Sequence, residues 1–246
     1  MLDIGDILDG WPYKPGEVNV RRIRGADDRE KYQMRLDLGL LQMELTGRPD
    51  GMRPEGCDSL FAYFENRLEK HRAEHGADEG FSLTPEECHD LRAEGAMYYH
   101  RYLAAFLLGD FDVTCRDTHR NLRMFDFLHA HGAEEDDRRS CEGYRPYVLR
   151  MYASARAKMD IVKDDLSHAV AVLNQTIEQI GDLFRERHSE SEIESSRDLE
   201  ILKTMCSEVR EMIPLDPRQR LKRQLKKAVK DERYEEAAYL RDKLNR

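Results

Sequence analysis

The sequence predicts a mainly α protein: a scaffold of helical hairpins with a small β-hairpin near its N-terminus and a two-helix hairpin at its C-terminus. Apolar residues recur at helical spacing over most of the chain beyond residue 57. Alternation of apolar and polar residues is concentrated in residues 18–37. Pro214 and Pro217 separate a last helical segment from the rest. These observations predict three domains, at residues 1–56, 57–213 and 214–246.

The composition is that of a protein that does not enter a membrane. Charged residues make up 36% of the 246 residues, and mean hydropathy is -0.78. An apolar run close to the ~20 residues that a membrane helix needs is lacking. The N-terminus MLDIGDILDG is acidic and lacks the basic start of a secretory signal. We therefore expect a cytoplasmic protein.

The charge is distributed unevenly. The chain carries a net charge of -9, and residues 214–246 hold eleven Lys and Arg against six Asp and Glu, so this segment carries +5 and residues 1–213 carry -14. Such a basic run forms a solvated helix face, meets an acidic partner, or meets the acidic body of a second copy. The acidic body opposes attraction to nucleic acid. The run comprises Arg218, Arg220, Lys222, Arg223, Lys226, Lys227 and Lys230.

The N-terminal region is expected to hold an arm and a β-hairpin. The arm contains DGWPYKPG, and Trp11 is predicted to anchor it on the body. Residues 18–24 and 31–37 form the hairpin around the four-residue turn GADD. The following LGLLQMELTG is compatible with a strand or a helix, and GRPDGMRPEG is a loop.

Start and stop signals divide the remainder into helices. Asp58 is the expected cap of the first, and Thr84, Pro85 and Glu87 form a strong start for the second. Pro146 is expected to interrupt the fourth region. The expected ranges are 58–75, 84–108, 110–131, 134–163, 165–187 and 190–212.

Two junctions of this scaffold resemble tetratricopeptide repeats. Residues 102–122 look like two long helices joined at Gly109-Asp110-Phe111, and residues 153–177 look similar around Leu166. Phe111 and Leu166 hold equivalent places but lie 55 residues apart, whereas this repeat has a period of about 34. The array is therefore degenerate or interrupted by an extra helix. An ordinary antiparallel helix bundle remains the alternative.

The C-terminal segment resembles the UVR motif of the bacterial excision-repair proteins UvrB and UvrC. Two short helices are expected around a turn at Asp231-Glu232-Arg233. Tyr234 and Leu244 stand where the family usually has Phe and Ile. The other matching residues are Leu221, Leu225, Ala228, Val229, Glu232, Glu235, Ala237, Ala238, Leu240, Arg241 and Asp242.

The resemblance implies that the hairpin makes protein–protein contacts, either with a partner or with its own kind. Arg241 and Asp242 are then expected to supply polar pairing at the rim. On the first helix, Leu221, Leu225 and Val229 are expected to take the buried stripe, with basic residues on both sides. The expected apolar contact residues are Leu221, Leu225, Val229, Tyr234, Leu240 and Leu244.

Signals for enzyme chemistry are weak. His71 and His75, like Cys115 and His119, share a helix face at i, i+4, but the spacing supplies no third metal ligand. The chain has no CxxC pair, phosphate loop or GxSxG motif. We expect reduced thiols, no metal, no cofactor and no catalytic residue. The free cysteines would be Cys57, Cys88, Cys115, Cys141 and Cys206.

These observations favour a non-enzymatic interaction or adaptor protein that uses its C-terminal hairpin for partner or self association. The alternative is an accessory DNA-repair factor that contacts nucleic acid through the basic run at residues 218–230. An enzyme of unknown chemistry in the helical body is a third hypothesis. A group of aromatic residues at positions 98–127 is expected to be core rather than a stacking platform for bases.

Overall fold

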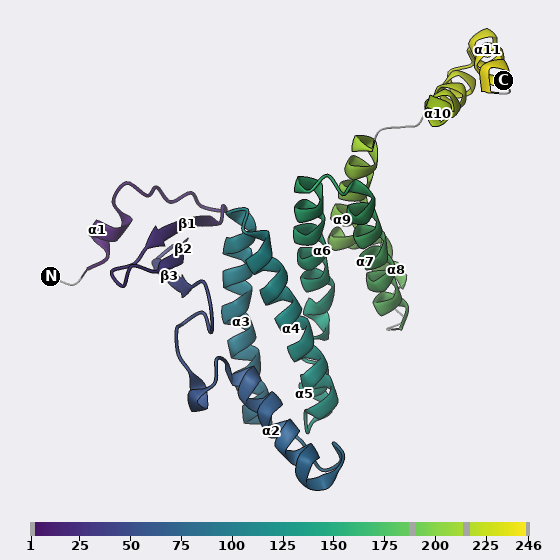
Figure 1. Ribbon diagram of the computed structural model, residues 1–246. Helices are drawn as coiled ribbons and strands as arrows, with labels where there is room; N and C mark the ends of the chain where they lie inside the picture. The colour runs from purple at the N-terminus through teal and green to yellow at the C-terminus, as the bar shows by residue number, and fades with distance from the viewer. Residues whose placement is uncertain (1–2, 187–189, 214–216, 245–246) are drawn as a thin grey trace.

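The structure, a computed structural model, describes residues 3–186, 190–213 and 217–244 (Figure 1). It confirms the mainly helical class, the N-terminal β structure and the C-terminal helical hairpin. The strands are β1 (Asn19–Arg24), β2 (Glu30–Leu36) and β3 (Gly39–Glu44). The helical elements of the N-terminal region and scaffold are α1 (Gly5–Leu8), η1 (Pro54–Gly56), α2 (Leu60–His75), α3 (Pro85–Leu107), α4 (Phe111–His131), α5 (Glu135–Arg139), η2 (Glu142–Tyr144), α6 (Arg145–Val162), α7 (Leu166–Glu186), α8 (Glu190–Ser195) and α9 (Arg197–Met212); the C-terminal helices are α10 (Pro217–Lys230) and α11 (Tyr234–Leu244).

The N-terminal β structure is a three-stranded antiparallel sheet in the order β1-β2-β3, one strand more than the predicted hairpin. The undecided segment after β2 becomes β3, because Leu41 and Met43 alternate with polar positions and turn inward. The loop between β1 and β2 has five residues, 25–29, rather than the predicted four. It is closed by a hydrogen bond of 2.8 Å from the Gly25 N–H to the carbonyl of Arg29. The sheet packs against α3 through Tyr32 and Met34, among others.

The N-terminal arm lies on the outer side of this sheet. The Arg21 guanidinium stacks on the ring of Trp11 at 4.1 Å and donates to the carbonyl of Ile7 at 2.8 Å. Arg35 lies 5.8 Å from the ring centre of Tyr13. The prediction that Trp11 anchors the arm is confirmed, and the anchor is a cation–π contact.

Two helix starts show how the caps act. The N-cap of α2 is Ser59 rather than the expected Asp58: the Ala62 N–H donates to the Ser59 hydroxyl at 3.0 Å, while Asp58 pairs with Arg53. The capping box of α3 is confirmed, with Thr84 and Glu87 bonded to each other's backbone N–H groups at 3.2 and 2.9 Å.

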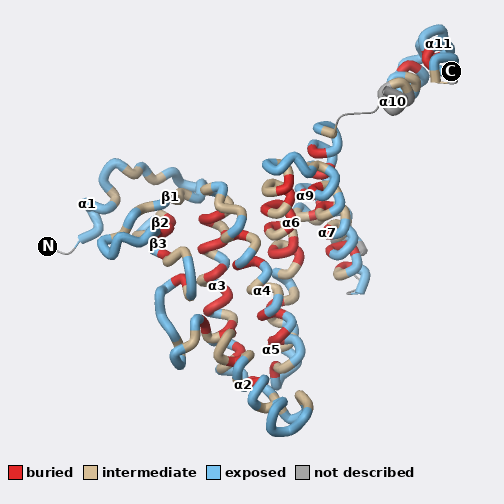
Figure 2. Tube along the Cα trace, viewed as in Figure 1, coloured by how far each residue is buried: buried red, intermediate tan, exposed pale blue. Residues whose placement is uncertain are grey.

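Consecutive long helices pack side by side through the scaffold, α3 on α4, α4 on α6, α6 on α7 and α7 on α9 (Figures 1 and 2). Buried residues face these seams. Alanines at the α6–α7 contact, Ala153, Ala157 and Ala169, are fully buried and let the two helices approach closely. Of the predicted regions, 190–212 divides at Ser196, whose hydroxyl caps α9.

The predicted region 134–163 divides into α5, η2 and α6, with Pro146 in the first turn of α6. The short elements α5 and η2 stand between the pair α3–α4 and the pair α6–α7. They lie within the 55-residue interval between Phe111 and Leu166, which begin α4 and α7. The segment between α4 and α6 therefore consists of one turn of helix and a 3₁₀ turn.

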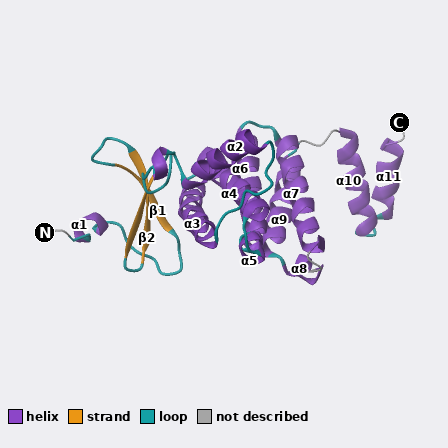
Figure 3. Cartoon of the chain, turned by 90° about the horizontal axis from the view of Figure 1, so that it is seen from below, coloured by secondary structure: helices purple, strands orange, loops and turns teal. Residues whose placement is uncertain are grey.

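The C-terminal hairpin consists of α10 and α11 packed side by side (Figure 3). The turn lies at Asp231-Glu232-Arg233, as predicted, and Glu232 adopts the left-handed conformation with φ 56°. The two helices share a small apolar cluster of their own. Among the described residues, no helix is both long and apolar enough to cross a membrane.

Candidate functional site

The two helices of the C-terminal hairpin hold each other through few apolar side chains. Ala228 is fully buried, Ala237 and Leu240 are nearly so, and Leu221 and Leu225 pack against them. Small alanines at the centre let α10 and α11 approach closely. Three of the predicted contact residues therefore hold α10 and α11 together. They are Leu221, Leu225 and Leu240.

Two other predicted contact residues face outward. Val229 is 52% exposed and Tyr234 is 67% exposed, and they lie on either side of the turn. The prediction that Val229 belongs to the buried stripe of α10 is wrong, because the neighbouring Ala228 takes that place.

The polar residues of α11 lie at the edge of the hairpin. Arg241 and Asp242 are exposed and lie 3.5 Å from each other. Leu244 is half-buried at the end of α11. Arg233 in the turn forms ion pairs with Asp231 and Glu236 on its own hairpin. Arg233 and Arg241 are thus paired within the hairpin, and Val229 and Tyr234 are exposed apolar residues beside the turn.

Part of the basic run of α10 is described. Lys226, Lys227 and Lys230 are exposed. The side chains of Arg218, Arg220, Lys222 and Arg223 lie outside the described residues. The three described lysines surround the turn-proximal half of α10, where Val229 lies.

A second candidate surface is a groove of about 870 Å³ between α3 and α6, beside α4 and α5. On α3 its lining runs from Arg92 to Tyr102, which is about three helical turns, or ~15 Å. The ring centroids of Tyr99 on α3 and Tyr147 on α6 lie 6.0 Å apart. The apolar part of the lining includes Ala96, Met124, Phe125 and Val148.

The groove has an acidic, tyrosine-rich character. Burial raises the pKa of Tyr147 to about 12 and also raises that of Tyr102, so both hydroxyls stay protonated and can donate hydrogen bonds. At the α5 end, Arg92 is neutralised by Asp137 at 2.8 Å. The adjacent Asp136 is exposed and makes no ion pair within the described part of the chain. The groove therefore offers an apolar floor beside a free carboxylate.

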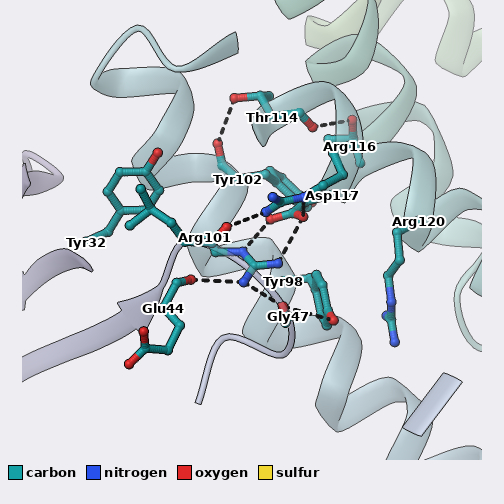
Figure 4. Close-up of polar contacts among 12 residues, drawn as sticks. Tyr32, Glu44, Gly47, Tyr98, Arg101, Tyr102, Thr114, Arg116, Asp117 and Arg120 are labelled. Atoms are coloured by element: carbon teal, nitrogen blue, oxygen red, sulfur yellow. Dashed lines mark hydrogen bonds and ion pairs between the residues drawn. The ribbon is translucent and has the colours of Figure 1, made fainter. Parts of the chain in front are cut away.

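Between the sheet and the helices lies a buried ionic network (Figure 4). The Arg101 guanidinium on α3 donates to both carboxylate oxygens of Asp117 on α4, at 2.6 and 3.0 Å. It also donates to the carbonyls of Glu44 and Gly47, at 2.9 and 2.8 Å. Arg116 pairs with Asp117 from the outside, at 2.8 Å. One arginine therefore ties the end of β3 to two helices.

A second ionic contact connects α2 to the scaffold. The Glu94 carboxylate on α3 accepts hydrogen bonds from the backbone N–H groups of Leu60 and Phe61, at 2.6 and 3.1 Å, and pairs with Arg120. A carboxylate at a helix N-terminus stabilises the helix through the free N–H groups there. Both Arg101 and Arg120 also stack on the ring of Tyr98.

These contacts settle the role of most of the aromatic group. Tyr98, Tyr102, Phe125 and Phe127 are buried, and the nearby arginines are engaged with protein groups. The prediction that this group is core is confirmed for these four residues. Tyr99 differs, because it is exposed along the groove.

The histidine and cysteine pairs gain no third metal ligand within the described residues. His71 and His75 stack at 4.2 Å, and within the described ranges no three His, Cys, Asp or Glu side chains gather as metal ligands. Burial raises the thiol pKa of Cys88 and Cys115 to about 11, so both thiols are protonated near neutral pH.

The fold is that of a mainly helical protein with a C-terminal two-helix hairpin. Comparison with family models finds the UvrB/uvrC motif in this hairpin, with the match at residues 218–246. The match covers α10, apart from its first residue, and all of α11. Searches of the curated proteins and of the solved structures found no match for the chain.

The sequence analysis did not predict two features, a buried ion pair and a groove. Arg101 and Asp117 lie 16 positions apart on different helices, and no motif connects them. The groove arises from the position of α5 and η2, which the sequence presented as one interrupted helical region. The signal available beforehand was Tyr99, an aromatic residue next to the buried Tyr98 and therefore on a different helix face.

Proposed function

We propose that this protein is a non-enzymatic adaptor of the cytoplasm whose UvrB/uvrC-motif hairpin docks onto a partner protein or a second copy. The scaffold of tetratricopeptide-like hairpins presents that module. The observation that carries the proposal is the exposure of Val229 and Tyr234 beside the turn, within the segment that matches the motif. Docking would bury apolar groups that the hairpin alone leaves in water.

The proposal is tested by truncating the exposed ring. Replacing Tyr234 with alanine is expected to weaken association of the full-length chain by about 2 kcal/mol, roughly thirtyfold, because aromatic anchors carry a large share of interface energy. Sedimentation equilibrium measures self association, and titration with a captured, purified partner measures binding to it.

Tyr239→Ala is the matched control. Tyr239 is 64% exposed on the same helix but is not among the residues that carry the resemblance. We expect the Tyr239→Ala variant to associate as strongly as the unmodified chain does. Equal affinity of the Tyr234→Ala variant and the unmodified chain would show that the exposed residues beside the turn of the hairpin do not belong to the interface.

The second candidate function is direct contact with nucleic acid, favoured by the exposed Lys226, Lys227 and Lys230. These lysines border apolar groups, and residues 1–213 carry a charge of -14 that repels phosphates. We expect weak, sequence-indifferent DNA binding with a dissociation constant of ~10⁻⁶ M or higher at physiological salt.

Fluorescence anisotropy with labelled duplex and single strand measures this binding. The affinity is expected to fall steeply as salt rises, because phosphate contacts release counterions. Tight binding that survives raised salt would overturn the adaptor proposal in favour of a DNA-repair accessory factor.

A further inference from the structure

The N-terminal sheet has an edge at which backbone groups are left unpaired. The order β1-β2-β3 makes β3 an edge strand, with β2 on one side only. The Glu44 N–H at the end of β3 donates to the carbonyl of Pro49 at 2.9 Å, away from β2. Backbone direction alternates along an antiparallel strand, so the N–H and C=O groups of Leu40 and Gln42 point the same way. Within the described part of the chain, these four groups have no backbone partner.

This edge carries no charge, unlike the opposite edge of the sheet. Residues 38–43 read LGLLQM, whereas β1 carries three arginines. Charged residues protect an edge strand from pairing with another chain, and an uncharged apolar edge lacks that protection. Beside the turn into β3, Leu38 is 97% exposed and Leu36 is 42% exposed. The edge therefore combines unpaired backbone groups with apolar side chains in water.

A second copy of β3 fits this edge when the two strands run antiparallel about Leu41. In that register Leu40 of each copy lies opposite Gln42 of the other, and each such pair exchanges two backbone hydrogen bonds. Gly39 then lies opposite the second copy's Met43. A Cβ at Gly39 would meet nothing within 4 Å, so this position leaves space for the approaching strand. One register thus satisfies all four unpaired groups of both copies.

The charge near the edge does not oppose this pairing. Residues 18–44 hold six Lys and Arg against five Asp and Glu, so the sheet carries +1, whereas residues 1–213 carry -14. At physiological salt, interactions between exposed charges are screened beyond about 8 Å. Two sheets can therefore approach each other without the repulsion that two acidic scaffolds would experience.

We propose that β3 of one copy pairs with β3 of a second copy, which joins the two three-stranded sheets into one antiparallel sheet. This contact is separate from the C-terminal hairpin and adds a second interaction surface. It is isologous, since both copies give the same strand, so it closes as a two-fold dimer. The paired segment is short, and small interfaces are weak and transient. We expect a dissociation constant on the order of 10⁻⁴ M.

Hydrogen exchange resolved to single amides tests the pairing in the full-length chain. Exchange at Leu40 and Gln42 is expected to be fast at ~10⁻⁶ M chain and at least about twofold slower at ~10⁻³ M, because pairing gives both amides an acceptor. The amides of Leu41 and Met43 face β2, so they are expected to be protected at both concentrations. The Tyr234→Ala chain is expected to show the same slowing, because its sheet is unchanged.

A proline at position 42 tests the backbone contact itself. Gln42→Pro removes one outward N–H and keeps the bonds to β2, since an edge strand tolerates proline where its nitrogen faces solvent. We expect this variant to lose the concentration-dependent slowing at Leu40. Gln42→Ala is the matched control and is expected to keep it. Both variants lose the hydrogen bond of 2.9 Å that the Gln33 side chain donates to Gln42, and only proline also loses the N–H.

A charge on the edge is the second test. Leu40→Lys keeps every backbone group but places two like charges diagonally across the strand pair, which is unfavourable. We expect it to abolish the slowing at Gln42. Val18→Lys is the control, because Val18 is 48% exposed next to β1, at the other edge of the sheet, and this variant is expected to keep the slowing.

The outcomes decide for or against the pairing. Constant fast exchange up to ~10⁻³ M overturns it and leaves the edge to a strand of a different protein. Slow exchange at both concentrations overturns it as well, because the chain's own residues then cover the edge. Slowing that persists in Leu40→Lys places the contact elsewhere. If Gln42→Pro unfolds the sheet, seen as fast exchange at Leu41 and Met43, the comparison of Leu40→Lys with Val18→Lys decides.

Discussion

Replacing Asp117 with asparagine is expected to destabilise the folded chain by about 3–5 kcal/mol, because it leaves a buried guanidinium without its counter-charge. The side chains of Arg101 and Asp117 are each 1% exposed, and two hydrogen bonds of 2.6 and 3.0 Å join them. Asparagine keeps the shape of the side chain but removes the negative charge. The substitution therefore isolates the ionic contribution from packing.

Urea unfolding followed by far-ultraviolet circular dichroism measures this loss. Asp112→Asn is the matched control, since Asp112 is exposed on the same helix, and we expect it to change the free energy of unfolding by less than about 0.5 kcal/mol. A loss below about 1 kcal/mol for Asp117→Asn would show that the carbonyls of Glu44 and Gly47 alone satisfy Arg101.

Replacing Leu225 and Leu240 together with aspartate is expected to unfold the hairpin and leave the scaffold folded. Leu240 is buried between α10 and α11, and Leu225 packs against the same cluster. These helices are 14 and 11 residues long, and helices shorter than about 12–15 residues are marginal in water without tertiary contacts. Two carboxylates in place of the leucines remove that support, and association is lost with it.

Hydrogen exchange read by mass spectrometry distinguishes the two parts of the chain. Protection is expected to vanish in α10 and α11 and to persist in α3, α4, α6 and α7. Arg241→Ala together with Asp242→Ala is the control, because both residues are exposed on α11. Loss of protection in the scaffold as well would mean that the hairpin belongs to the main core.

The sequence predicted well those features that are set by neighbouring residues. The capping box at Thr84, the turn at residues 231–233 and the break before α6 each depend on a few adjacent positions. The same reasoning does not distinguish between two neighbouring residues that are both suitable as the N-cap of a helix. Asp58 and Ser59 are both good caps, and in the structure Ser59 caps α2 while Asp58 pairs with Arg53.

Features that depend on several distant elements could not be read from the sequence. The third strand required a partner, β2, before its alternation became distinct from a helix. Val229 and Ala228 are both compatible with an apolar stripe, and the close approach of α10 to α11 selects the smaller residue for the interior. Likewise, the groove depends on where α5 and η2 lie beside α3 and α6.

The position of Trp11 has a consequence for spectroscopy. It is the chain's only tryptophan, and it lies against Arg21 in the N-terminal arm rather than in any of the apolar clusters of the scaffold. Intrinsic tryptophan emission of this protein therefore reports the arm and the sheet beneath it. Circular dichroism reports the helices instead, so an emission change without a change in ellipticity is a direct optical measure of arm detachment.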